Sequence, residues 1–129
     1  MSLTIATEAP SFDLPGVDGR NHSLDDYADA PILAVVWSCN HCPYVRHVET
    51  GFATLVDAHP GLQVVGICSN DAAAYPDDAP SGLAEQSARA GWGFPYLVDE
   101  EQTVGRAFGA ACTPDFFLYD ATGCLAYRG

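Results

Sequence analysis

The sequence has 129 residues and a mass of 13.7 kDa, which fits one domain, and 48% hydrophobic against 17% charged residues excludes a disordered chain. Its 17 acidic residues face five arginines and no lysine, so the net charge of -12 disfavours nucleic acid and anionic membrane surfaces as partners. The longest apolar run, residues 32–37, is too short to span a bilayer. These numbers predict a soluble globular domain.

The cysteines and the N-terminus bear on the cellular location. Five cysteines are an odd number, in a chain long enough to fold without disulfides, which argues against a secreted disulfide scaffold. Residues 1–10 lack the basic region and the apolar core of a signal peptide. We therefore expect a cytoplasmic protein whose thiols have individual roles.

The pattern of apolar residues predicts alternating strands and helices. Continuous apolar runs favour strands that are buried on both faces, and apolar residues at steps of three and four favour amphipathic helices. In chain order, the predicted elements are a hairpin that turns at Asp18-Gly19, a short helix at 24–27 capped by Ser23 with Asp26, a strand at 32–37, a helix at 43–59, a strand at 62–67, a polar loop at 69–80, a helix at 81–90, a strand at 96–98, a helix at 100–108 capped by Asp99, and two strands at 115–119 and 124–127.

This order of elements is typical of a thioredoxin-like α/β fold. Strands that are linked by helices pair in parallel through right-handed crossovers, whereas the last two strands form an antiparallel edge. The sequence therefore predicts a central mixed β-sheet flanked by helices, with an N-terminal hairpin extension.

The motif Cys39-Asn40-His41-Cys42 lies between a predicted buried strand and a predicted helix. A C-x-x-C motif alone is compatible with zinc, a cluster or no function, but this position favours redox chemistry. The start of a helix supplies free N–H groups and the positive end of the helix dipole, which stabilise a thiolate. We predict that Cys39 is the exposed nucleophile and that Cys42, one helical turn inward, is the resolving thiol.

Three further residues are predicted to shape the site. As an imidazolium, His41 would lower the pKa of Cys39, and a solvent-exposed side chain without an electronic role is the alternative. In a thioredoxin-like fold, Thr113-Pro114 would form a cis-proline loop that faces the cysteines, where the backbone of Thr113 pairs with a bound peptide. A trans proline that merely opens the following strand is the alternative.

The remaining three cysteines are weaker candidates. Cys68 ends the strand beside the one that leads to Cys39, and Cys112 stands two residues before Pro114. Both are expected on the rim of the site, where Cys112 is a candidate for an additional redox role and a purely structural thiol is the alternative. Cys124 is expected to be a small core residue.

Several strings of the sequence resemble a known family. They are CNHCPYVRH at 39–47, SND at 69–71, YPDD at 75–78, FPYLVDE at 94–100 and CTPDFFL at 112–118. Together they resemble a bacterial thioredoxin-like redoxin family within the alkyl hydroperoxide reductase and thiol-specific antioxidant (AhpC/TSA) group, from about residue 12 to the end. The resemblance implies a thioredoxin fold, thiol–disulfide or antioxidant activity, Cys39 and Cys42 as the redox pair, and Pro114 as the cis-proline.

The same group contains peroxiredoxins, whose peroxidatic cysteine aligns with Cys42. Peroxiredoxins have Thr or Ser three residues before that cysteine and Pro seven residues before it, where this sequence has Cys39 and Val35. Both departures weaken the case for a dedicated peroxidase. Thioredoxin itself has Gly-Pro between its cysteines, whereas Asn40-His41 stands here, so a general reductase identical to thioredoxin is disfavoured too.

We therefore predict a thiol–disulfide oxidoreductase that acts through Cys39 and Cys42 without a bound cofactor. Its partners would be a protein or small-molecule disulfide and a thiol reductant or oxidant that resets the pair. The first alternative is a thiol peroxidase that uses Cys42. The second is a metal-binding module with Cys39, Cys42 and either Cys112 or a histidine, although no second C-x-x-C completes a four-ligand site.

The C-terminus carries a last expectation. A thioredoxin-like domain ordinarily closes with a helix after its last strand, whereas this sequence stops at Tyr127-Arg128-Gly129. We expect residues 1–129 to form a single domain that is truncated and lacks its C-terminal helix. The apolar sheet face left bare by that helix would favour a homodimer.

Overall fold

The computed structural model describes residues 8–129, which form one five-stranded sheet, one two-stranded sheet and the helices around them. In chain order the elements are β1 (Asp13–Pro15), β2 (Asn21–Ser23), the 3-10 helix η1 (Leu24–Tyr27), β3 (Ile32–Trp37), α1 (Pro43–Asp57), β4 (Leu62–Cys68), the 3-10 turn η2 (Pro76–Asp78), α2 (Pro80–Ala90), β5 (Tyr96–Val98), α3 (Thr103–Phe108), β6 (Asp115–Tyr119) and β7 (Leu125–Arg128). None of the helices within this part of the chain combines the length and apolar character needed to cross a bilayer.

The larger sheet is mixed, as predicted. Its strand order is β5-β4-β3-β6-β7. The neighbours β3–β4 and β4–β5 run parallel, whereas β3–β6 and β6–β7 run antiparallel. β1 and β2 form the predicted N-terminal hairpin as a separate antiparallel pair. The C-terminal helix that the sequence analysis expected to be missing is not among the described elements, of which β7 is the last.

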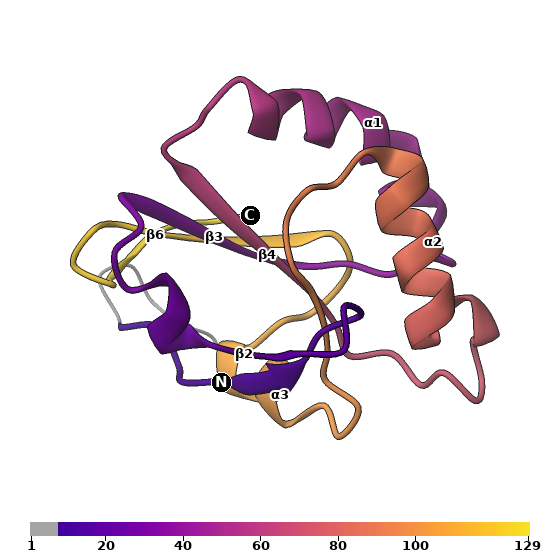
Figure 1. The fold of residues 1–129 in the computed structure, drawn as a ribbon. Helices are drawn as coiled ribbons and strands as arrows, with labels where there is room; N and C mark the ends of the chain where they lie inside the picture. The colour runs from indigo at the N-terminus through magenta and orange to yellow at the C-terminus, as the bar shows by residue number, and fades with distance from the viewer. Residues whose placement is uncertain (1–7) are drawn as a thin grey trace.

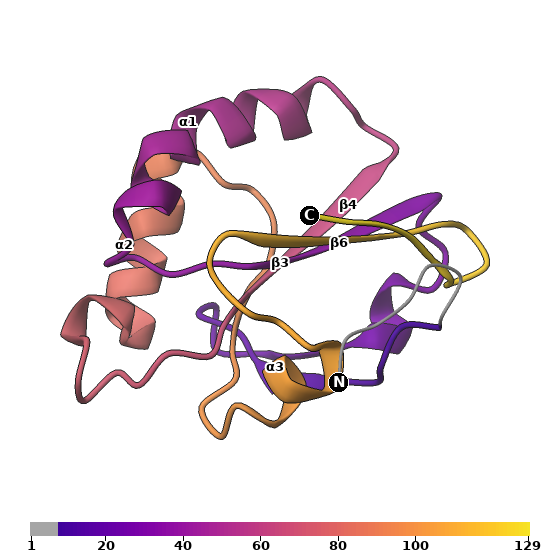
Figure 2. The ribbon, with the colours of Figure 1, turned by 180° about the vertical axis from the view of Figure 1, so that it is seen from behind.

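Helices cover both faces of the large sheet, which explains the apolar runs in its central strands. Figures 1 and 2 show α1 on one face and α3 with the β1–β2 hairpin on the other. Along β3, Val35 and Trp37 pack into the core on the α3 face, together with Phe108. Ala34 and Val36 pack on the opposite face, against Phe52 of α1. A strand covered on both sides needs apolar residues at consecutive positions.

Three local predictions need correction. The polar loop predicted at 69–80 contains the turn η2, whose last residue, Asp78, is buried. Helix α3 begins at Thr103 rather than after Asp99, although the Asp99 carboxylate still accepts the N–H of Gly105, at 2.7 Å. Cys124 is not a core residue, because it precedes β7 and is half-buried.

The order of the strands determines where the candidate residues meet. β3 ends at Trp37, and the Ser38 N–H donates to the carbonyl oxygen of Ile67 on β4. The C-x-x-C segment therefore leaves the sheet at its centre, beside the end of β4. Since β6 lies on the other side of β3 and runs antiparallel to it, the residues just before Asp115 come to the same edge.

Candidate active site

Two loops that lie far apart in the sequence bring Cys39, Cys42 and Thr113 together. The Thr113–Pro114 peptide bond is cis, which confirms that prediction. The Thr113 hydroxyl lies 3.3 Å from Cys39 Sγ, and Cys42 Sγ donates to the Thr113 carbonyl oxygen at 3.6 Å. One residue of the cis-proline loop thus contacts both thiols.

The predicted exposure of the two cysteines is wrong, since their positions are reversed. Cys39 is fully buried, at 0% exposure, whereas Cys42 is partly exposed. Helix α1 starts at Pro43, as predicted, so Cys42 is its N-cap residue and does not lie one helical turn inward. Cys39 belongs to the segment that leaves β3 and packs in the core with Val45 and Tyr96.

The surroundings of the two thiols shift their pKa values in opposite directions. Burial raises the pKa of Cys39 to about 11. Partial burial also opposes ionisation of Cys42, but the Val45 N–H and the Thr113 hydroxyl outweigh it, so the pKa of Cys42 is lowered. The start of α1 therefore stabilises a thiolate, as predicted, but on Cys42 rather than on Cys39.

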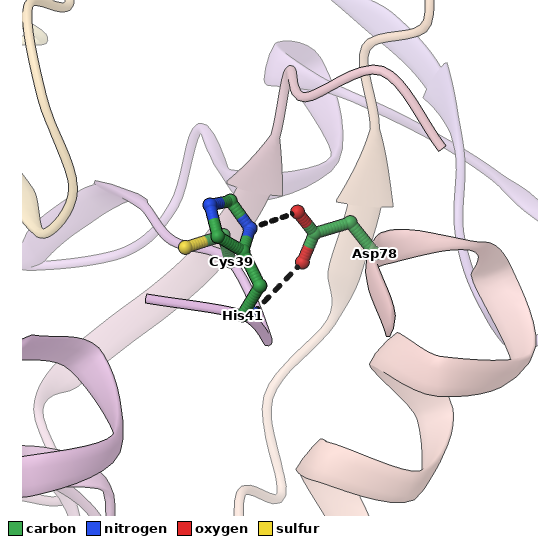
Figure 3. A group of neighbouring side chains, drawn as sticks. All are labelled: Cys39, His41 and Asp78. Carbon is green, nitrogen blue, oxygen red and sulfur yellow. Dashed lines mark hydrogen bonds and ion pairs between the residues drawn. The ribbon is translucent and has the colours of Figure 1, made fainter. Parts of the chain in front are cut away.

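The pKa of Cys39 is raised by burial, whereas the prediction for His41 required it to be lowered. Nδ1 of His41 lies 2.5 Å from Oδ2 of Asp78 at the end of η2 (Figure 3). The ring of His41 stacks on the ring of Tyr75, with centroids 4.1 Å apart and planes 10° from parallel. The alternative of a solvent-exposed side chain is wrong too, because the His41 side chain is 34% exposed and its ring contacts Asp78 and Tyr75.

Asp78 is the site residue that the sequence analysis missed. Its side chain is 0% exposed and carries the anchoring hydrogen bonds of the C-x-x-C segment. Besides the His41 ring, it accepts the backbone N–H of Asn40 at 2.6 Å, the N–H of His41 at 3.2 Å and the side-chain amide of Asn70 at 3.0 Å. The YPDD string at 75–78 was the only signal, and it places two acidic residues in a loop without saying which one turns inward.

Helix α2 and the turn before it hold the rest of this segment. The Asn40 side chain donates to the carbonyl oxygens of Asp77 and Gly82 and accepts from Arg89, each at 3.0 Å. Below it, the Gln86 side chain donates to the carbonyl oxygen of Cys39 at 2.9 Å. The buried Gln86 thus holds the backbone of Cys39, while Asp77, Gly82 and Arg89 hold the side chain of the adjacent Asn40.

Cys42 opens onto a cavity of about 370 Å³. Its lining includes Trp37, His41, Cys42, Tyr75, Arg106, Cys112 and Thr113. Cys112 is exposed, so the structure brings it to the rim as predicted. The predicted rim position of Cys68 is wrong, because this residue is buried at the end of β4; burial raises its pKa to about 12, so its thiol resists ionisation.

The group Cys39, His41 and Asp78 also has the residue types of a metal site, with one candidate ligand atom from each within 4.8 Å of the others. The carboxylate oxygens of Asp78, however, already accept hydrogen bonds from four donors. His41 Nδ1 is one of these donors, so a metal ion bound there would have to replace the hydrogen bonds that hold the segment. The donor set fits a hydrogen-bonded site better than a metal centre.

The sequence model of the AhpC/TSA family matches residues 5–128. The chain belongs to the AhpC/TSA family. This confirms the resemblance that the CNHCP and CTPDFFL strings indicated.

Curated members related to this AhpC/TSA chain carry two kinds of name. "Thiol-disulfide oxidoreductase ResA" of Geobacillus thermodenitrificans is 27% identical over 125 residues, which are 95% of this chain and 67% of that protein. "Putative peroxiredoxin Rv2521" of Mycobacterium tuberculosis is 34% identical over 110 residues, which are 84% of this chain and 65% of that protein. The chain thus spans about two thirds of the length of these relatives.

Solved structures confirm the predicted thioredoxin-like fold. A hypothetical protein, SMc02350 of Sinorhizobium meliloti, superposes with a TM-score of 0.95 at 41% identity, over 100% of this chain and 72% of that one. The thioredoxin domain of a thiol–disulfide oxidoreductase of Bacteroides vulgatus superposes with a TM-score of 0.81 at 15% identity, over 98% of this chain and 89% of that one. The second comparison bears on the fold alone.

Proposed function

We propose that this AhpC/TSA protein is a thiol–disulfide oxidoreductase whose redox pair is Cys39 and Cys42, and that Cys42 is the attacking thiolate. The observation that carries the proposal is the position of Cys42, which caps α1 and lines an open cavity while Cys39 lies buried behind it. The attacking thiol of a disulfide exchange must be both ionised and accessible. Only Cys42 of the pair has a lowered pKa and an exposed surface.

The reaction has two exchange steps. The Cys42 thiolate attacks one sulfur of a bound disulfide, so that a mixed disulfide forms and the other half of the substrate leaves as a thiolate. Cys39 then attacks the Sγ of Cys42, and the remaining half of the substrate departs. Two electrons have passed to the substrate, and the protein holds a Cys39–Cys42 disulfide that an external dithiol reduces again. The reverse sequence oxidises a substrate, and neither direction requires a bound cofactor.

Substrate binding is proposed at the cis-proline loop. The Thr113 carbonyl oxygen, which now accepts from Cys42, is the acceptor nearest to the attacking sulfur. An extended peptide that pairs with the Thr113 backbone would place its disulfide over Cys42. Protein disulfides and small disulfides both fit this arrangement, since the cavity of about 370 Å³ is open.

Trapping the mixed disulfide tests this proposal. The reduced Cys39→Ser variant should accumulate a covalent adduct with a disulfide-containing peptide, located on Cys42 by peptide mass mapping. The matched control, Cys42→Ser, should give no adduct on Cys39, because that thiol is buried and protonated. If the adduct instead forms on Cys39 in the Cys42→Ser protein, the assignment of Cys42 as the attacking thiol is wrong.

A thiol peroxidase is the second candidate, and one contact favours it. Peroxiredoxins place a Thr or Ser hydroxyl close to the peroxidatic sulfur, and this sequence has Cys39 at that position. The structure supplies a hydroxyl from elsewhere, since Thr113 hydrogen-bonds Cys42 and helps to lower its pKa. Stopped-flow consumption of hydrogen peroxide by the reduced protein distinguishes the two activities: a rate no higher than that of free cysteine would end the peroxidase proposal.

Two further expectations remain proposals. The cytoplasmic location would be tested by fractionating cells that produce the protein, with detection in the soluble fraction as the expected result. The homodimer would be tested by analytical ultracentrifugation of the reduced protein, which should show a mass near twice 13.7 kDa. A single species at the monomer mass would contradict the dimer.

A further inference from the structure

We infer that His41, oriented by Asp78, is the base that removes the proton from Cys39 when Cys39 resolves the mixed disulfide. The inference rests on the proposed function and adds to it the group that moves the proton. In this inference His41 accepts the proton directly, whereas Asp78 is a positioning residue that acts through His41.

The second exchange step needs such a base. A thiol is a poor nucleophile compared with a thiolate. Because burial raises the pKa of Cys39 to about 11, this side chain is almost entirely protonated at neutral pH. It must therefore lose its proton inside the protein, at the moment when it attacks the sulfur of Cys42.

The other titratable groups around Cys39 do not fill this role. The charges of Asp78 and Cys42 affect the pKa of Cys39. The charge of Cys39 in turn affects the pKa values of Cys68 and Tyr96. The buried Cys68 and Tyr96 have raised pKa values, so they already hold their protons at neutral pH. Cys42 is bonded to the substrate at this stage, and the Asp78 carboxylate is occupied by four donors. His41 remains.

The geometry around His41 leaves one ring nitrogen ready to accept a proton. The Asp78 carboxylate can only accept a hydrogen bond, so in the neutral imidazole of His41 the proton is on Nδ1 and the lone pair is on Nε2. Stacking on Tyr75 fixes the plane of the ring. A ring nitrogen of His41, the sulfur of Cys39 and a carboxylate oxygen of Asp78 lie within 4.8 Å of one another. In Figure 3 the sulfur is beside the ring, on the side away from Asp78.

The proton and electron balance of the step closes without a further reactant. Cys39 Sγ attacks Cys42 Sγ, the bond from Cys42 to the substrate sulfur breaks, and the Cys39–Cys42 bond forms. The proton of Cys39 moves to Nε2 of His41, whose positive charge is stabilised by the buried carboxylate of Asp78. Because His41 also lines the cavity, it can return this proton to the departing substrate thiolate.

A chromophoric disulfide separates the two steps. With excess reduced protein and 5,5'-dithiobis(2-nitrobenzoate), attack by Cys42 releases one coloured thiolate, and resolution by Cys39 releases a second. The exposed Cys112 and the half-buried Cys124 are replaced by serine in every protein, so that only the pair reacts. Stopped-flow absorbance then gives a rate for each step.

The His41→Gln variant should slow the second step by about a hundredfold or more, which is the usual contribution of a positioned base, and leave the first step within about threefold. In this variant the second rate should rise about tenfold per pH unit, because it follows the ionisation of Cys39, whereas the parent protein should show a much weaker dependence. Imidazole should restore the second step of His41→Ala. His47→Gln, an exposed histidine on α1, is the matched control and should change neither rate.

The outcomes separate the inference from the proposed function. An unchanged second step in His41→Gln, or an equal slowing of both steps, overturns the role of His41 and leaves the redox pair intact. A parent protein without a second coloured release overturns the proposed function itself. Asp78→Asn should slow the second step less than His41→Gln does, and faster resolution in that variant would contradict the positioning role of Asp78.

Discussion

Cys39 and Cys42 are separated by two residues, yet one behaves as part of the core and the other as part of the surface. Cys39 has 0% exposure, and its backbone carbonyl is bound by Gln86. Cys42 faces the cavity, with the first N–H groups of α1 directed at its sulfur. The difference arises at Pro43, where the helix begins. A C-x-x-C motif therefore does not reveal which thiol attacks until the first helical residue is known.

The two thiols also differ in what surrounds them. On the Cys39 side, Asp78, Asn40 and Gln86 form a buried polar network with closely paired donors and acceptors. On the Cys42 side, the thiol has a cavity, an exposed Cys112 and the Thr113 carbonyl. One side holds the geometry fixed while the other leaves room for a substrate. This division suits a reaction in which only one sulfur must meet the partner.

The largest expected difference between Cys39 and Cys42 is in their rates of alkylation. At about pH 8, a thiol with the pKa of Cys39, about 11, is about a thousandth ionised, whereas Cys42 should be at least a tenth ionised. Iodoacetamide should therefore modify Cys42 at least about a hundredfold faster than Cys39, and the burial of Cys39 widens the gap. Peptide mass mapping over time measures both rates. Comparable rates in the folded protein would show that the two surroundings are not as different as the structure has them.

Alkaline unfolding tests the buried thiols as a class. Cys39 and Cys68 have pKa values raised from 9.0 to about 11 and about 12 in the folded protein. A raised pKa contributes stability that is fully present below the unfolded value and is lost as the pH rises toward the folded value. Between about pH 8 and pH 10, under reducing conditions, we expect these two thiols to lower the free energy of unfolding in urea by about 3 kcal/mol, in addition to a smaller contribution from the buried Tyr96 and Tyr119.

The variant Cys68→Ala supplies the control for that experiment. Whatever its stability at neutral pH, this variant should lose about 1.4 kcal/mol less than the parent protein over the same pH range, because one of the two thiols with a raised pKa is gone. An identical pH dependence in both proteins would mean that Cys68 does not resist ionisation in the fold.

Removing Asp78 should destabilise the protein, because this carboxylate accepts hydrogen bonds from the backbone N–H groups of Asn40 and His41. The variant Asp78→Ala leaves those donors without their partner, and we expect a loss of about 2 kcal/mol in the free energy of unfolding. The neighbouring Asp77, whose side chain is 66% exposed, is the matched control, and Asp77→Ala should cost less than about 0.5 kcal/mol. Equal losses in the two variants would contradict the anchoring role of Asp78.

The fold was largely predictable because its signals are local. The apolar run at 32–37 and the helical spacing from Val45 to Val56 each specify an element without reference to the rest of the chain. The cis-proline loop was predictable once the strand order was assumed, since that order places Thr113 beside the cysteines.

The site was less predictable because its determinants are non-local. Asp78 meets His41 across 37 residues, and nothing in the YPDD string says that its second carboxylate turns inward. The predicted start of α1 at residue 43 is correct, but the burial of Cys39 depends on Tyr96 and Gln86, which come much later in the sequence. Helix boundaries are the least certain part of a sequence-based assignment, and α3 begins later than Asp99 suggested.

The side chain of Thr113 contacts both thiols, and replacing it should have the smallest effect of the changes considered. Its hydroxyl helps to lower the pKa of Cys42 and also hydrogen-bonds Cys39. Replacing it in Thr113→Val removes a hydrogen bond worth about 1 kcal/mol, so the pKa of Cys42 should rise and its alkylation at about pH 7 should slow by about threefold to tenfold. Thr50→Val, an exposed position on α1, should leave the rate unchanged. A faster alkylation of Cys42 in Thr113→Val would mean that the hydroxyl shields the thiolate rather than stabilising it.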